Sequence, residues 1–161
     1  MKIAPGCRLV LRLGVVTLVA MLCVSSAEPQ DPDLKPTYGA VKLKAGFEPD
    51  PYKKDLEAGG DVKTDKGDVT AYVAKAPDFQ LNYEAGEYVL TIYAESKKDT
   101  TLLIRTPDNK WLANDDGIEN TLHPLIKFEK PKSGRYDIWV GVLNKDDGTP
   151  KATLFITELK K

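Results

Sequence analysis

Cysteine is nearly absent from this 161-residue chain, and both cysteines, Cys7 and Cys23, lie within the first 27 residues. Those residues have a basic start without acidic residues, a short apolar stretch and a small-residue end, which is typical of a secretory signal peptide. We predict cleavage after Ala27, which leaves a chain without cysteine. An exported protein without disulfides depends on its core for stability.

Two other interpretations of this segment are weaker. A membrane anchor needs about 20 apolar residues in succession, and Arg12 interrupts the stretch. Lipid attachment at Cys23 is disfavoured because the bulky Leu22 precedes it, where lipoprotein signals usually have a small residue. We therefore predict an exported protein, either periplasmic or secreted, with no transmembrane segment after cleavage.

The chain also lacks an excess of basic residues. Residues 28–161 contain 20 Lys and Arg against 24 Asp and Glu, a net charge of −4. The lysines are scattered among acidic residues and form no basic stripe, which excludes nucleic acid as a partner. A chain of this length can build one domain and is too short for two.

The residue types of nucleophilic catalysis are scarce. Residues 28–161 contain one histidine, His123, and two serines, Ser96 and Ser133, and nothing around them resembles a nucleophile held by a base. Zinc requires several Cys or His ligands. Acidic residues are plentiful but lie in turns, whereas a glycosidase needs one carboxyl kept protonated by burial. We predict that the protein is not an enzyme.

The dominant pattern is alternation with a period of two. The run "RYDIWVGV" (135–142) places Ile138 and Val140 on one face and Asp137 and Trp139 on the other. Similar runs, separated by Gly, Asp and Asn turns, indicate eight or nine short strands in an all-β, antiparallel sandwich or barrel. Residues 28–37 contain three prolines and predict an extended tether before the domain.

The stretch "TPDNKWLANDDG" (106–117) raises the question of a cation site. Pro107, Asp108 and Asn109 are typical of a hairpin turn. The oxygen-rich remainder and a second loop suggest calcium as a tentative cofactor, although neither loop fits an EF-hand and an ordinary turn is the favoured alternative. The candidate ligands are Asn114, Asp115, Asp116, Glu119, Asn144, Asp146 and Asp147.

Aromatic residues suggest a second kind of site. Trp139 and Tyr93 alternate outward on their strands, and with Trp111 they form a tentative surface for binding sugars or peptides. The favoured alternative is that a loop, or the proline-rich segment 48–52, covers them.

Longer stretches carry a family resemblance. The order "APDFQLNYEAGEYVLTIYAESKKDTTLLIRTPDNKWLANDDG", then "PLIKFEKPKSGRYDIWVG", resembles the bacterial pre-peptidase C-terminal domain. Small exported proteins of this type also share a "GFEPDPY…AGG" segment like residues 46–60. The resemblance covers residues 38–159 and implies a single jelly-roll-like β-sandwich domain over residues 38–161.

The resemblance also implies a role. Such domains usually accompany secreted proteases and aid export, localisation or substrate binding without catalysis. We therefore expect a non-catalytic binding module for a protein or polysaccharide of the cell envelope or exterior. A structural envelope protein and, less well supported, a hydrolase are the alternatives.

Two positions depart from the family pattern. Relatives often have cysteines at the positions of Val69 and Ala113, which are apolar here. The resemblance implies that these two residues lie close together across two strands.

Overall fold

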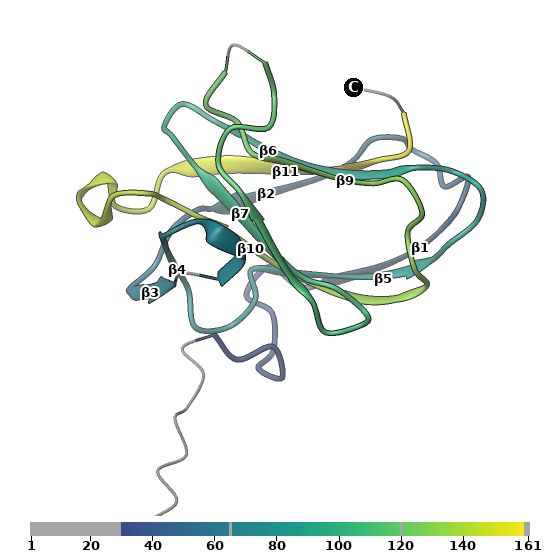
Figure 1. The fold of residues 1–161 in the computed structure, drawn as a ribbon, viewed down its shortest axis with the longest axis horizontal. Coiled ribbons are helices and arrows are strands. Elements are labelled where there is room, and N and C mark those ends of the chain that lie inside the picture. The colour runs from purple at the N-terminus through teal and green to yellow at the C-terminus, as the bar shows by residue number, and fades with distance from the viewer. Residues whose placement is uncertain (1–29, 65, 120, 160–161) are drawn as a thin grey trace, which may run out of the picture.

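The protein folds as two packed β-sheets (Figure 1). This computed structural model describes residues 30–64, 66–119 and 121–159. The five-stranded sheet has the order β1 (Ala40–Lys44), β5 (Phe79–Glu84), β10 (Gly134–Gly141), β7 (Thr101–Arg105) and β8 (Trp111–Asn114). The four-stranded sheet has the order β2 (Tyr52–Glu57), β11 (Lys151–Thr157), β6 (Leu90–Ser96) and β9 (Leu125–Phe128).

A short ribbon and two single turns complete the fold. The ribbon pairs β3 (Val62–Thr64) with β4 (Ala71–Val73), and the turns η1 and η2 span Lys66–Asp68 and Lys145–Asp147. The predicted all-β sandwich is confirmed, and the two main sheets together contain nine strands. In the described part of the chain, no helix is long and apolar enough to cross a membrane.

The core lies between the two sheets and follows the alternation of the sequence. Ile138 and Val140 of β10 are fully buried and pack in one cluster with Ile92 of β6 and Leu154 of β11. Each strand thus contributes every second side chain to the interface between the sheets. This single cluster holds the two layers together.

One strand runs against the prediction of an antiparallel architecture. β1 pairs with β5 in parallel, with Ala40 opposite Gln80 and Lys44 opposite Glu84. After β1 the chain crosses to β2 in the other sheet and returns to β5 only after the β3–β4 ribbon. No tight hairpin therefore constrains the direction of β1 relative to its neighbour.

The segment expected to be a tether contacts the domain over its described part. The backbone N–H groups of Asp31 and Thr37 donate to the carbonyls of Lys75 and Pro77, at 2.9 Å each. These bonds hold residues 31–37 along the loop that precedes β5. Residues 28 and 29, and the predicted signal peptide with Cys23 and the cleavage site after Ala27, lie outside the described residues.

Candidate functional site

A groove of about 1210 Å³ crosses one end of the four-stranded sheet. It is open to solvent along its length, and most of its lining comes from β2, β6 and β11. The lining residues are Tyr38, Asp55, Leu56, Glu57, Glu95, Ser96, Lys97, His123, Pro150, Lys151, Ala152 and Thr153.

The register of the sheet places the polar lining residues on the outward face. Leu56 and Ala152 belong to the core cluster, so their neighbours along the strands point away from it. Thr153 of β11 stands opposite Asp55 of β2 on one side and Glu95 of β6 on the other. Three strands thus present a continuous row of polar side chains.

A second row of outward-facing side chains lies two residues along the strands from Asp55, Thr153 and Glu95. Lys151 stands opposite Glu57, and Lys97 directly follows Ser96, the partner of Ala152. Lys97 and Lys151 are exposed, and no ion pair within the described part of the chain neutralises either of them. The groove therefore has one row with Asp55 and Glu95 and another with Glu57 and two lysines.

His123 closes the groove on the side of β9. The carbonyl of the next residue, Pro124, accepts a hydrogen bond from the N–H of Ala94 at 3.2 Å, which holds this loop beside β6. The Nδ1 atom of His123 is buried and has no hydrogen-bond partner. Among the described residues, no carboxylate is therefore hydrogen-bonded to this nitrogen.

The ring of Tyr93 is covered, as in the favoured alternative, and does not form the tentative exposed binding surface. Its side chain does point outward on the four-stranded sheet, but only 3% of the residue is exposed. The ring stacks on that of Phe155 with centroids 4.5 Å apart and planes 2° apart, and Lys53 Nζ lies 5.2 Å from the Phe155 centroid. These contacts occupy ring faces that a sugar would need for stacking.

Trp139 is likewise outward but fully buried, which agrees with the favoured alternative that its ring is covered. Its ring lies 5.3 Å from that of the half-buried Trp111, and Ala71 and Val73 of β4 complete a second apolar cluster around it. The reason is that the β3–β4 ribbon folds over the outer face of the five-stranded sheet. The covering segment is therefore this ribbon and not residues 48–52.

The same cluster contains the two positions singled out by the family resemblance. Val69 and Ala113 both pack against it and both line one small void beside Leu103. The implied proximity of Val69 and Ala113 is confirmed, but Val69 lies in the turn between η1 and β4 and not on a strand. The turn η1 lies directly against β8, since a Cβ atom on Gly67 would stand 2.5 Å from the Ala113 nitrogen.

The two loops proposed as calcium sites meet at a residue that the sequence reasoning missed. The pKa of the Asp99 carboxyl is raised by its burial and by the negative charges of Asp116, Asp115 and Asp147. The charges of both acidic loops therefore act on the Asp99 carboxyl. Its sequence signal was weak, because an aspartate after a lysine pair at a strand end is an ordinary turn residue.

Several of the side chains proposed as calcium ligands make other contacts in the fold. The Asn114 side-chain oxygen accepts a hydrogen bond from the Leu125 N–H at 2.9 Å and so ties β8 to β9. Lys98 Nζ lies 3.7 Å from an Asp147 oxygen, while Glu119, Asn144 and Asp146 are exposed. Among the described residues, no three Asp, Glu, His or Cys side chains form a group that could hold a metal. Calcium binding stays a prediction.

The first half of the stretch at residues 106–117 is a hairpin turn, as predicted. The Thr106 N–H donates to the Lys110 carbonyl at 2.9 Å, and Asn109 has a φ of 62°. Asp108 accepts hydrogen bonds from the Thr106 hydroxyl at 2.7 Å and from Lys132 Nζ at 2.8 Å, and these bonds lower the pKa of its carboxyl. The turn is thus fixed by its own polar side chains.

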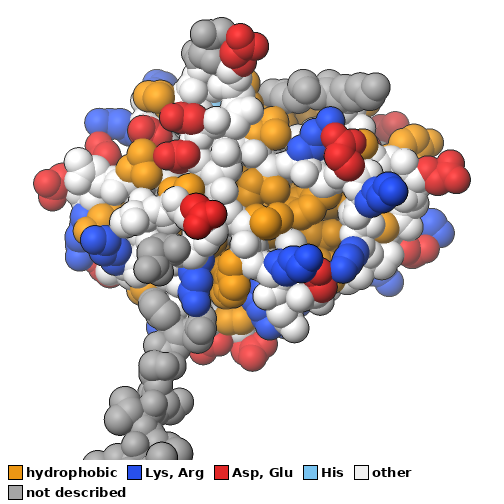
Figure 2. Space-filling view, viewed as in Figure 1, with side chains coloured by type: hydrophobic (Ala, Val, Ile, Leu, Met, Phe, Trp, Pro, Cys, Tyr) orange, Lys and Arg blue, Asp and Glu red, His pale blue; other side chains and the backbone are white. Residues whose placement is uncertain are grey.

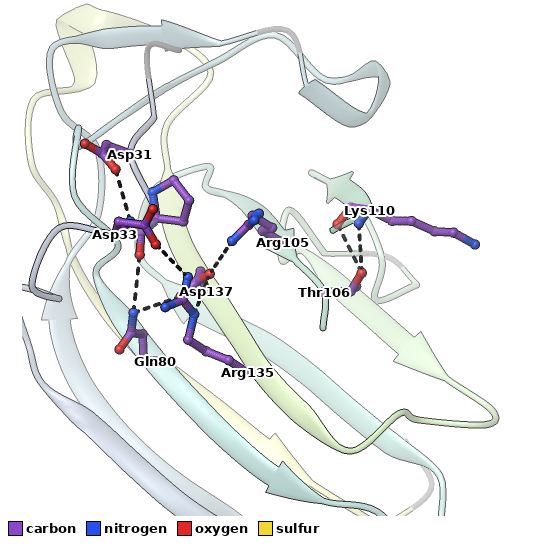
Figure 3. A network of polar contacts seen from close by, with 9 residues as sticks. Asp31, Asp33, Gln80, Arg105, Thr106, Lys110, Arg135 and Asp137 are labelled. Atoms are coloured by element: carbon purple, nitrogen blue, oxygen red, sulfur yellow. Dashed lines mark hydrogen bonds and ion pairs between the residues drawn. The ribbon is translucent and has the colours of Figure 1, made fainter. Parts of the chain in front are cut away.

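A polar network crosses the outer face of the five-stranded sheet (Figure 3). Asp137 of β10 is 1% exposed and accepts hydrogen bonds from Gln80, Arg105 and Arg135. Burial raises the pKa of its carboxyl, an effect that the two arginines and the amide partly offset. Arg135 also pairs with Asp33, so the network anchors residues 31–37 and serves the fold.

On the face shown in Figure 2, Lys and Arg side chains are interspersed with Asp and Glu. The groove on the four-stranded sheet is the candidate site.

Comparisons with known proteins add a structural likeness. No family model and no curated protein matches the chain. The fold is similar to the crystal structure of the pre-peptidase C-terminal domain of collagenase from Bacillus anthracis. The identity is 14% and the TM-score 0.45, over 81% of this chain and 99% of that one. That domain is of the family that the sequence resembles.

Proposed function

We propose that this chain is an exported binding module that holds an extended ligand in the groove of the four-stranded sheet without catalysing a reaction. The observation that carries the proposal is the groove itself, with its two rows of polar and charged side chains on a rigid sheet. Binding sites placed on strands are held more firmly than sites on loops.

The hydroxyl groups in the groove support a non-catalytic role. The Thr153 hydroxyl donates to Asp55 at 2.8 Å, and the Ser96 hydroxyl donates to the Lys151 carbonyl at 2.9 Å. Both hydroxyls thus hold neighbouring strands together. The Ser96 hydroxyl is thus bonded to a backbone carbonyl and the Thr153 hydroxyl to a carboxylate on the neighbouring strand, and neither bond joins the hydroxyl to a histidine as in a catalytic triad.

The proposed location follows from the sequence. A basic, then apolar, then small-residue start directs a protein to export, and the family resemblance implies an accessory role beside secreted peptidases. A ligand in the cell envelope or the exterior fits both features.

A groove-filling substitution tests the proposal. Thr153→Trp places an indole in the middle of the groove, and Asn82→Trp is a matched control on an exposed position of β5. We expect the wild type and the Asn82→Trp variant to co-sediment with insoluble envelope material from the producing cells. The Thr153→Trp variant should bind it at least about tenfold more weakly.

Two outcomes would contradict the proposal. Equal binding by the two tryptophan variants would remove the groove as the site. Release of product from a protein or glycan substrate by the purified wild type, abolished in the Thr153→Trp variant, would show that the groove is catalytic.

A further inference from the structure

The direction of the groove restricts the shape of its ligand. The groove runs across the strands, from Asp55 on β2 over Thr153 on β11 to Glu95 on β6 and His123 beside β9. Neighbouring strands lie about 4.8 Å apart, so this path is roughly 14 Å long. That length accommodates about four residues of an extended chain, at roughly 3.3 Å per residue.

The two rows restrict the charge of the ligand. Asp55 and Glu95 flank Thr153 in one row, while Lys97 and Lys151 outweigh Glu57 in the other. Side chains two residues apart on a strand are about 6.8 Å apart, so a ligand lying between the rows meets negative charge on one side and, beside Lys151 and Lys97, a net positive charge on the other.

An extended peptide has the matching arrangement. Its successive side chains point to opposite sides of the backbone, so alternating basic and acidic residues place all cations on one side and all anions on the other. Polysaccharides are disfavoured, since Tyr38 is the one Phe, Tyr or Trp among the described residues that line the groove, whereas sugars stack on aromatic ring faces.

We propose that the groove binds an extended peptide segment in which basic and acidic residues alternate, with the basic side chains toward Asp55 and Glu95 and the acidic side chains toward Lys97 and Lys151. This inference rests on the proposed binding function of the groove. The charged groups are solvent-exposed or half-exposed, so binding is weak and falls as ionic strength rises.

A synthetic peptide of about eight residues with alternating lysine and glutamate, blocked at both ends and labelled with a fluorophore, is the probe. A peptide of the same composition with the lysines and glutamates in two blocks is its control. Fluorescence anisotropy at low salt should give a Kd for the alternating peptide at least about tenfold lower than for the block peptide.

Charge-removing variants locate the binding. Lys97→Gln with Lys151→Gln should weaken binding of the alternating peptide at least about tenfold. The matched control, Lys42→Gln with Lys44→Gln on β1 of the other sheet, should leave its Kd unchanged. Asp55→Asn with Glu95→Gln should weaken it to a similar extent, because the basic side chains lose their partners.

The failure of this inference is distinct from the failure of the binding function. Equal Kd values for the two peptides, or for the Lys97/Lys151 variant and its control, would overturn the peptide proposal. If envelope binding still disappeared in the Thr153→Trp variant, the groove would remain a binding site for another class of ligand. If the Thr153→Trp variant bound both peptide and envelope like the wild type, both proposals would be wrong.

Discussion

Asp78 shows how one buried carboxylate completes a sheet. Its Oδ2 accepts the Val140 N–H at 2.8 Å, and its own N–H donates to the Ile138 carbonyl at 2.9 Å. The side chain thus replaces a backbone partner for β10 at the point where β5 begins. The residue is 2% exposed, and burial raises the pKa of its carboxyl from 3.8 to about 7, while the bond to Val140 lowers it.

This pKa predicts a loss of stability toward neutral pH. The folded state binds a proton more tightly than the unfolded state, so the contribution of Asp78 is fully present below pH 3.8 and is lost as the pH rises to about 7. At higher pH, a charged carboxylate must stay buried. The free energy of unfolding should therefore fall across this window, apart from the opposing effects of other carboxylates.

Asp78→Asn tests the prediction, because an amide oxygen still accepts the Val140 N–H but carries no charge. At pH 8 the variant should be more stable than the wild type, by at most about 4 kcal/mol for a pKa difference of about three units. Near pH 4 the two should be equally stable. Urea unfolding at both pH values measures this, and a variant less stable than the wild type at pH 8 would contradict the assignment.

At the scale of elements, the β3–β4 ribbon decides what the outer face of the five-stranded sheet exposes. It is joined to the sheet by two hydrogen bonds between Tyr72 and Val142, at 2.8 and 3.1 Å. The turn between its strands brings Val69 to the side chains around Trp139 and Ala113. The ribbon therefore closes a second, smaller apolar cluster.

A disulfide across this cluster is the prediction for the ribbon. Val69→Cys with Ala113→Cys should oxidise in air, because both residues pack on one cluster and a bridge requires Cα atoms within about 7 Å. A free-thiol assay on the folded protein should find no reactive thiol. Two reactive thiols would mean that the ribbon does not hold Val69 against β8.

The acidic loops around Asp99 carry a separate prediction. A calcium ion at a concentration a hundredfold above its Kd would stabilise the fold by about 2.7 kcal/mol and raise the Tm by roughly 5–10 °C. Asn114 is already bonded to Leu125, so we expect instead no calcium-specific shift. Asp115→Asn with Asp116→Asn should leave the Tm unchanged or slightly raise it, because both charges raise the pKa of Asp99.

Melting curves in calcium and in chelator, with magnesium as the control for screening, make the measurement. A calcium-specific rise in Tm that disappears in the Asp115/Asp116 variant would establish a calcium site in the loop 114–117.

At the scale of the whole molecule, the two sheets share one core and should unfold together. Ile138 is fully buried in the cluster that also contains Ile92 and Leu154 of the opposite sheet. No disulfide can substitute for this cluster in residues 28–161, which lack cysteine. The stability of the fold therefore depends on the apolar surface between the layers.

Ile138→Asp should prevent folding, because it buries an unpaired charge at the centre of this core. Ile138→Val is the control and should cost only about 1 kcal/mol. Thermal unfolding followed by circular dichroism distinguishes the two. An aspartate variant that melted like the wild type would mean that β10 does not face the core.

The limits of sequence reasoning are visible in particular residues. The period of two correctly placed Ile138 and Val140 inside and Trp139 outside its strand, because alternation is a local property of extended chains. It could not show that Trp139 is covered, since the covering ribbon is about 70 residues away in sequence. The parallel direction of β1 was missed for the same reason.

The candidate site shows the same difference between what the local sequence predicts and what contacts between distant segments decide. The sequence by itself determined an all-β sandwich, the hairpin turn at residues 106–110 and a scarcity of catalytic residue types, and its first 27 residues predict export. Only the tertiary structure decided that Asp55, Glu95, His123 and Lys151 line one groove and that the charges of two acidic loops act on Asp99. Strand identity follows from the local pattern of side chains, whereas a site across three strands depends on which distant strands pair and in which register.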